Sequence, residues 1–174
     1  MENFNPTWIT NKEFCDLKPE NVFHKACVSS DYKPDESLSN KHILFRKKFS
    51  ANKGGKFVIR ITADDYYKLY INGRFVTQGP APAYYFNYYY NTVDVTDFIT
   101  DGENTVAVHT YYQGLINRVW VSGDRRHGLA LDLKNDENTI IATDESWKCH
   151  EHTGFSALGK FGYDTAFAEC YDAG

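Results

Sequence analysis

The sequence YKLYINGRFVTQGP, residues 67–80, decides the fold, and the rest of the chain is best understood outward from it. Hydrophobic and polar residues alternate on both sides of Asn72-Gly73. This pair is a strong hairpin signal, because a type I′ turn needs positive φ at both central positions and these two residues tolerate it. The stretch therefore predicts two antiparallel strands joined at Asn72-Gly73.

A second stretch, NTVDVTDFITDGENTVAV over residues 91–108, predicts a strand, a turn and a return strand. Thr96 can cap a short turn over residues 97–99, since Thr is favoured at N-cap positions. Asp101-Gly102 breaks that turn, and β structure resumes at Asn104. Together the two stretches are typical of a β-sandwich.

Size and composition agree with one β-rich domain. The chain has 174 residues, among them 12 Phe, 13 Tyr and 3 Trp, which are residues that favour strands. Its net charge of −4 lacks the basic footprint of a nucleic-acid-binding protein. No apolar run approaches the roughly 20 residues of a membrane span, so we expect no membrane partner. The N-terminus lacks the basic and then apolar pattern of a secretory signal, which slightly favours a cytoplasmic location.

The four cysteines, Cys15, Cys27, Cys149 and Cys170, are widely spread. None forms a CxxC pair, so neither a zinc site nor a thioredoxin motif is indicated. With no export signal, we expect free thiols that are buried or half-buried.

The strand pattern predicts an all-β fold, a jelly-roll β-sandwich over residues 41–174, preceded by an irregular segment over residues 1–40 that packs on it. Prolines interrupt the first segment, and a short helix is expected near residues 11–17. The expected strands lie near residues 42–49, 57–64, 67–71, 74–76, 84–95, 104–112, 129–133, 139–143, 147–151 and 165–171.

Five sequence pieces, in the right order, resemble the N-terminal sandwich domain of bacterial α-L-rhamnosidases. They are FRKKF at 45–49, YKLYING at 67–73, DVT with DGEN at 94–104, TDESWK at 143–148 and ECYDA at 169–173. The resemblance implies a galactose-binding-domain-like sandwich. The hairpin, DVT and GEN pieces also fit the sugar-binding domain of β-galactosidase-like enzymes, and the last two pieces favour the rhamnosidase type. One departure is His109-Thr110-Tyr111-Tyr112, where the family often has a Gly-Trp pair.

In the rhamnosidase family the catalytic carboxylates belong to a helical barrel that follows this domain. The resemblance therefore implies a non-catalytic accessory domain of a glycoside hydrolase, excised from a longer multidomain enzyme and packing on the catalytic domain of the parent chain. The aromatic surplus leaves open an independent carbohydrate-binding module. A stand-alone hydrolase is a third, weaker hypothesis, and we assign no catalytic residue, because the acidic residues lie mostly at turns.

The run YYFNYYY at residues 84–90 is expected to form a strand with one face in the core. Its other face could stack on sugar rings or pack against a neighbouring domain, and we favour packing. A second aromatic and basic cluster is expected on loops at one end of the sandwich. The candidates for carbohydrate or interdomain contact are Tyr85, Tyr89, Tyr111, Tyr112, Trp120, Arg125 and Arg126.

The segment Cys149-His150-Glu151-His152 places two histidines on one side of an expected strand, where both could reach one ion. A structural zinc site needs four ligands and no third is identifiable, so an exposed strand is the favoured interpretation. We therefore assign no metal ligand and no cofactor. Loop carboxylates and carbonyls could hold a structural calcium ion, without a ligand set that the sequence defines.

Overall fold

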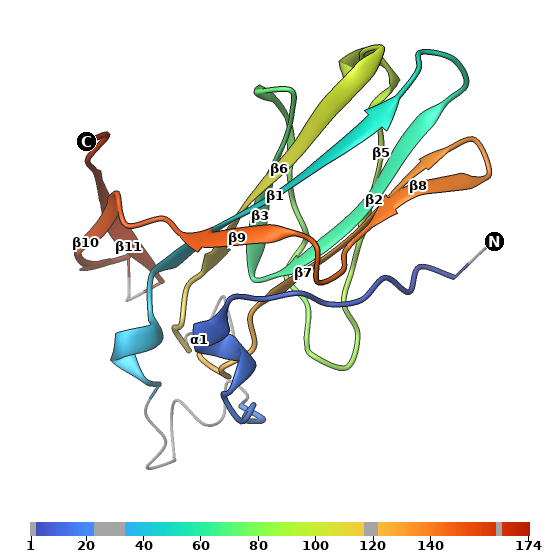
Figure 1. Ribbon diagram of the computed structural model, residues 1–174. Helices are drawn as coiled ribbons and strands as arrows, with labels where there is room; N and C mark the ends of the chain where they lie inside the picture. Colours follow the sequence, from blue (N-terminus) through green and yellow to red (C-terminus); the bar gives the residue numbers. More distant parts are fainter. Residues whose placement is uncertain (1–2, 23–33, 117–121, 163–164) are drawn as a thin grey trace.

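Two antiparallel sheets face each other in the computed structural model, which describes residues 3–22, 34–116, 122–162 and 165–174 (Figure 1). One sheet has five strands in the order β4-β3-β6-β1-β9, and the other has four in the order β5-β2-β7-β8. The elements are α1 (Lys12–Cys15), η1 (Glu36–Leu38), β1 (Lys41–Ala51), β2 (Phe57–Asp64), β3 (Tyr66–Ile71), β4 (Arg74–Gly79), β5 (Asn91–Asp94), η2 (Thr96–Phe98), β6 (Gly102–Tyr112), β7 (Gly128–Asn135), β8 (Asn138–Ala142), β9 (Lys148–Glu151), β10 (Phe155–Phe161) and β11 (Ala166–Tyr171). The predicted β-sandwich is confirmed.

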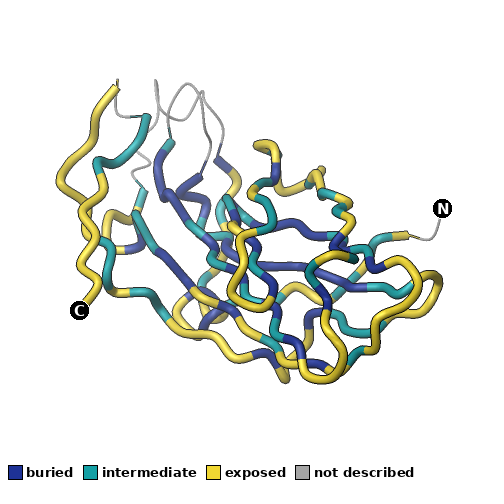
Figure 2. The backbone as a smooth tube through the Cα atoms, turned by 90° about the horizontal axis from the view of Figure 1, so that it is seen from above, coloured by how far each residue is buried: buried dark blue, intermediate teal, exposed yellow. Residues whose placement is uncertain are grey.

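The core lies between the two sheets and is built from alternate positions of the strands (Figure 2). Ile43 of β1 and Val106 of β6 point inward from the five-stranded sheet, and Ile59 of β2 and Leu131 of β7 meet them from the other, all four fully buried. Because strand side chains alternate between faces, the residues between these positions point away from the core. On β1, β3 and β6 those outward residues form one surface.

The hairpin turn adopts the predicted geometry, with φ of 51° at Asn72 and 76° at Gly73. Asn72 also does more than turn the chain. Its side-chain amide donates to Asn104 Oδ1 at 2.8 Å and to the Phe98 carbonyl at 3.0 Å, and its own Oδ1 accepts from Thr105 N at 2.9 Å. The two sequence stretches that decide the fold are thus tied together by the side chains of Asn72 and Asn104.

Thr96 does not cap the turn after β5, which corrects the expectation. The turn η2 begins at Thr96 itself, and the Asp94 carboxylate accepts from Thr96 N at 3.1 Å and from Thr96 Oγ1 at 2.7 Å. The Thr96 hydroxyl instead accepts a hydrogen bond from Phe57 N at 3.0 Å. Thr96 therefore links this turn to the start of β2.

The expected strand over residues 84–95 was too long. Only β5 forms within it, and residues 84–90 make a loop closed by a hydrogen bond from Asn87 N to the Tyr84 carbonyl. Phe86 and Tyr89 are more than half exposed there. The pairing with β2 begins only at Asn91, so residues 84–90 stay outside the sheet. The run therefore has no strand faces.

Strands β10 and β11 form a separate hairpin that projects from the left side of the sandwich in Figure 1. The final strand β11 was predicted, whereas β10 was missed. It holds to the five-stranded sheet through the segment after β9, where His152 N donates to the His42 carbonyl at 2.7 Å. Phe155 of β10 also stacks on the His42 ring, with centroids 4.1 Å apart.

The N-terminal segment lies along the four-stranded sheet. Ile9 and Leu129 exchange two backbone hydrogen bonds of 3.0 and 2.9 Å, and the Arg60 guanidinium lies over the Phe4 ring at 5.4 Å. The short helix expected near residues 11–17 is present as α1. This segment covers part of the outer face of β7, which is why β7 is buried on both faces.

Cys15, Cys149 and Cys170 are free thiols, as expected, but all three are exposed rather than buried. Cys27 lies outside the described residues. In the described part of the chain, no helix has both the length and the apolar character needed to cross a membrane.

Candidate functional site

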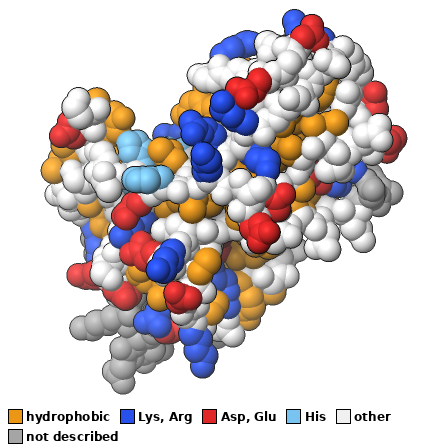
Figure 3. Space-filling model, viewed as in Figure 1, with side chains coloured by type: hydrophobic (Ala, Val, Ile, Leu, Met, Phe, Trp, Pro, Cys, Tyr) orange, Lys and Arg blue, Asp and Glu red, His pale blue; other side chains and the backbone are white. Residues whose placement is uncertain are grey.

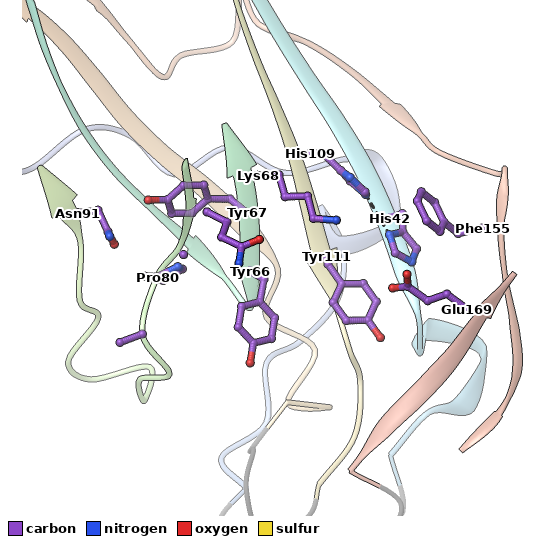
Figure 4. A pocket seen from close by; sticks show the side chains of 13 residues that line it. His42, Tyr66, Tyr67, Lys68, Pro80, Asn91, His109, Tyr111, Phe155 and Glu169 are labelled. Atoms are coloured by element: carbon purple, nitrogen blue, oxygen red, sulfur yellow. Dashed lines mark hydrogen bonds between the residues drawn. The ribbon is translucent and has the colours of Figure 1, made fainter. Parts of the chain in front are cut away.

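A hollow of about 470 Å³ lies on the outer face of the five-stranded sheet, between the sandwich body and the β10–β11 hairpin. The outward positions of β1, β3 and β6 form its floor, the hairpin forms one wall, and the end of β4 closes the opposite side (Figure 4). Its lining residues are His42, Tyr66, Tyr67, Lys68, Gln78, Gly79, Pro80, Ala81, Asn91, His109, Tyr111, Phe155 and Glu169.

Aromatic rings make up much of the lining. Tyr66 and Tyr111 lie with their rings nearly parallel, 16° apart, and with centroids separated by 6.5 Å. The centroid of the His42 ring lies 4.6 Å from that of Tyr111 and 4.1 Å from that of Phe155, and the His42 and Phe155 rings stack nearly parallel, with 14° between their planes. The floor therefore presents a continuous set of ring surfaces from β3 to β10.

Three histidines gather beside these rings: His42 of β1, His109 of β6 and His152, which follows β9. His42 Nδ1 and His109 Nε2 are 2.9 Å apart, and the rings of His109 and His152 have centroids 5.7 Å apart. Burial lowers the pKa of His42 to about 3 and that of His109 to about 4, with the neighbouring histidines and Lys68 adding to the effect. Both are therefore neutral at pH 7. Figure 3 shows histidine side chains gathered where the β10–β11 projection meets the sandwich body.

The charges on the lining balance. Lys68 and Glu169 are the only residues of a charged type on it, one of each sign, and the described structure gives neither side chain a hydrogen bond or ion pair. In Figure 4 the Glu169 carboxylate points toward His42, and the Lys68 ammonium extends over the floor toward Tyr111. These two groups are thus available to a ligand, together with the exposed amide of Gln78.

Two buried polar atoms on the lining have no hydrogen-bond partner among the described residues: the Tyr67 hydroxyl and His42 Nε2. Tyr67 is 1% exposed and His42 is 4% exposed. Burial also raises the pKa of Tyr67, so its hydroxyl stays protonated and can donate. Leaving such groups unpaired costs on the order of 1–3 kcal/mol each, so each calls for an explanation.

The histidine pair of the sequence, His150 and His152, separates in the structure. His150 is exposed on β9, and His152 follows the strand and packs edge-on against Phe155 and Tyr171. Within the described residues, no group of three or more His, Cys, Asp or Glu side chains could hold a metal ion.

A second cluster lies at the loop end of the sandwich. The Arg126 guanidinium stacks over Tyr85 at 4.2 Å and donates to Asp124 Oδ2 at 2.8 Å. Beside it, burial raises the pKa of Asp64 well above its usual value and that of Asp65 to about 6.

These buried carboxyl groups hold loops together. The Tyr88 hydroxyl donates to Asp64 Oδ2 at 2.5 Å, and Gln113 N donates to Asp65 Oδ2 at 2.7 Å. Glycosidase carboxyl groups flank an open site, whereas Asp65 is 6% exposed and already bonded to backbone. The cluster is therefore structural.

The structure separates the seven candidate contact residues. Tyr111 alone lines the hollow, while Tyr112 is a core residue whose hydroxyl accepts from Arg125 N at 2.9 Å. Tyr112 is thus unable to contact a sugar or a second domain. Arg125 pairs with Glu20 at 2.9 Å.

Of the others, Tyr85 and Arg126 stack on each other in the second cluster. Tyr89 is 54% exposed and lies outside the hollow. Trp120 lies outside the described residues.

Sequence reasoning missed most of the hollow, including His42, Lys68, His109 and Glu169. The signal was present in β1, β3 and β6, since the outward positions follow from the alternation that assigned the core. What the sequence lacked was the position of β10, which turns that outward surface into a hollow.

Comparison with known proteins identifies the family of this domain. Residues 55–173 match the family described as the alpha-L-rhamnosidase N-terminal domain. The structure resembles the GH78 family rhamnosidase of Bacillus sp. GL1 with a TM-score of 0.76 and 26% identity, over 99% of this chain and 16% of that one. No curated protein matches the chain.

Two further solved structures resemble it. The α-L-rhamnosidase of Dictyoglumus thermophilum gives a TM-score of 0.61 at 23% identity, over 98% of this chain and 19% of that one. The Aspergillus terreus enzyme gives 0.55 at 26% identity, over 69% and 16%. The chain thus spans less than a fifth of the length of each of these relatives.

Proposed function

The chain belongs to the family of alpha-L-rhamnosidase N-terminal domains, and on that premise we propose that it is the non-catalytic accessory domain of an α-L-rhamnosidase-type glycoside hydrolase. The observation that carries the proposal is the overlap of nearly the whole chain with one sixth of the Bacillus enzyme. Its partner is then the catalytic domain of the parent chain. The match also favours the rhamnosidase type over the β-galactosidase-like type.

The domain division that fits this proposal is an N-terminal segment, residues 1–40, packed on a sandwich of residues 41–174 and excised with it from the longer enzyme. The Ile9–Leu129 backbone pairing supports treating the two as one folding unit. An accessory domain needs no catalytic carboxylates of its own, in keeping with the structural use of the Asp64 and Asp65 carboxyls.

The β10–β11 hairpin supplies a docking surface for the catalytic domain. Leu158 is 71% exposed and Phe161 is 57% exposed, whereas Tyr171, also 57% exposed, packs against Phe155 and His152 on the side that faces the sandwich. A two-stranded hairpin is marginally stable in water by itself, and large exposed apolar side chains such as these favour an interaction site. We therefore place the contact with the catalytic domain on the outer side of this hairpin.

The test uses residues 1–174 and the catalytic remainder of the parent enzyme, produced separately. We expect residues 1–174 alone to release no product from an aryl α-L-rhamnoside, and to form a complex with the remainder on size-exclusion chromatography. Leu158→Asp should abolish that complex, while Phe75→Asp, a charge placed on an equally apolar exposed position of β4, should not. Hydrolysis by residues 1–174 alone would instead support a stand-alone hydrolase, and absence of a complex would contradict the docking role.

A further inference from the structure

The hollow on the five-stranded sheet holds polar groups that the protein itself leaves unused. The Tyr67 hydroxyl lies toward its β4 end, and His42 Nε2 lies toward its hairpin end. In Figure 4 the Tyr67 hydroxyl points toward the region of Asn91 and Pro80, away from His42. Both atoms are almost inaccessible to water, so an entering ligand would reach them only after neighbouring groups shift, and it would first meet the exposed side chains of the lining, such as Lys68 and Gln78.

We propose that this hollow is a binding site for an uncharged saccharide of one or two pyranose units. A sugar carries an apolar C–H face and a rim of hydroxyl groups. The parallel rings of Tyr66 and Tyr111 offer a flat surface for that face. Lys68, Gln78 and Glu169 offer donors and acceptors for the hydroxyls. The proposal rests on the accessory role above, in which it gives the domain a ligand.

The size and charge of the hollow select this class of ligand. Its volume of about 470 Å³ lies in the range of small-molecule sites and is too small for a folded partner. One ammonium and one carboxylate leave no net charge, since His42 and His109 are neutral at pH 7. An anionic ligand would gain from Lys68 and lose against Glu169, so a neutral ligand with many hydroxyl groups fits best.

Gly79 keeps the β4 end open. A Cβ at this position would lie 3.2 Å from the Tyr67 hydroxyl and 3.0 Å from Asn91 Oδ1. Its φ lies outside the left-handed region, so a side chain here would be crowded by these two neighbours and not strained by the backbone conformation. A larger residue would narrow this end of the hollow.

The experiment titrates residues 1–174 with L-rhamnose, D-galactose and sodium D-glucuronate, following assigned backbone amides by ¹H–¹⁵N spectroscopy. D-mannitol is the control for an open-chain polyol. We expect saturable shifts with at least one of the two neutral sugars at Tyr66, Lys68 and Tyr111. Glucuronate should bind more weakly than that sugar, and mannitol should cause no saturable shift.

Variants separate the hollow from other aromatic surfaces. Lys68→Ala and Gln78→Ala change exposed side chains, and each should weaken binding roughly 3- to 10-fold, the equivalent of one hydrogen bond. Gly79→Val should abolish binding. Tyr89→Ala, an exposed tyrosine outside the hollow, is the matched control and should leave affinity unchanged. Thermal melting of each variant checks that it is folded.

Three results would overturn the proposal: no saturable binding of either neutral sugar, shifts confined to the loop at residues 84–90, or equal affinity in wild type, Lys68→Ala and Gln78→Ala. Because the titration uses the domain alone, its failure leaves the docking role intact. Loss of the complex with the catalytic remainder, with sugar binding retained, would instead identify an independent carbohydrate-binding module.

Discussion

Replacing Asn104 with alanine should cost more stability than any other polar-to-alanine change at the turns of this sandwich. Asn104 is 1% exposed and stands where the hairpin meets the return strand. Its Oδ1 accepts from Asn72 Nδ2 at 2.8 Å, Thr100 N at 2.9 Å and Thr100 Oγ1 at 3.1 Å. Its amide donates to the Thr100 carbonyl at 2.7 Å and the Gly102 carbonyl at 3.1 Å.

The magnitude follows from these five hydrogen bonds. Each contributes about 0.5–1.5 kcal/mol net, and the partners at exposed positions 100 and 102 can partly rehydrate. We therefore expect Asn104→Ala to lower the free energy of unfolding by about 3–5 kcal/mol, a large part of the roughly 5–15 kcal/mol typical of a domain. Asn72→Gly keeps the positive φ and loses three side-chain hydrogen bonds at a more exposed site, so it should cost about 1–2 kcal/mol.

The assay is urea unfolding of wild type, both single variants and the double variant. The double variant should be about 1 kcal/mol less destabilised than the sum of the singles, because the Asn72–Asn104 hydrogen bond is removed only once. Asn138→Ala, at the exposed first position of β8, is the control and should change stability by less than about 0.5 kcal/mol. A loss below about 1 kcal/mol for Asn104→Ala, or additive single variants, would refute the view that this network joins the two halves of the motif.

Three more predictions follow from buried or constrained residues. Arg60→Ala should cost about 3 kcal/mol in urea unfolding, because it leaves the Asp132 carboxylate, 8% exposed and bonded to Arg60 Nε at 2.9 Å, without its bidentate partner; a loss below 1 kcal/mol would contradict this. Burial lowers the pKa of His127 to about 3 from 6.5, so the unfolded chain takes up the proton first as pH falls and the stability that His127 contributes above pH 6.5 is lost progressively toward pH 3. The stability advantage of wild type over His127→Gln should thus shrink by about 1 kcal/mol between pH 7 and pH 5.5, and an unchanged difference would refute the buried neutral imidazole. Gly114→Ala should destabilise more than Gly73→Ala in thermal melting, since both have φ above 70° but only at Gly114 would the Cβ meet backbone, 2.7 Å from the Cα of Ser39; equal melting temperatures would contradict it.

Local signals in the sequence were sufficient for most of the fold. The Asn72-Gly73 turn depends only on residues adjacent in the sequence, and so does the alternation of buried and exposed side chains through Val106 and Val108. The structure confirms both. Residues 84–90 were misassigned because tyrosine has a high strand propensity, and propensity is overridden where a loop must cross from one sheet to the other. The cap at Thr96 was misassigned because the Thr96 hydroxyl is engaged elsewhere: it bonds to Asp94 Oδ1 and accepts from Phe57 N, a residue distant in the sequence.

The candidate site was less predictable, for a physical reason that its residues make clear. His42, Lys68 and His109 are neighbours across β1, β3 and β6 but are far apart in sequence. Each stands at an outward strand position, and side chains at such positions are normally exposed to solvent and carry no function. Only Tyr111 was selected in advance, and it was selected as an aromatic residue on a loop rather than as part of this sheet.

The β10–β11 hairpin is what gives that outward surface its distinct chemistry. By stacking Phe155 on His42, it buries an imidazole that would otherwise be solvated and leaves His42 Nε2 without a partner in the described structure. The same hairpin presents Leu158 and Phe161 on its surface for docking. If the catalytic domain binds there, docking and the shape of the hollow are coupled through one small element. Saccharide affinity at Lys68 and Gln78 should then be higher in the complex than in the isolated domain, because the hairpin wall is held in place before the sugar arrives. Equal affinity in the two states would show that the hairpin is already rigid without its partner.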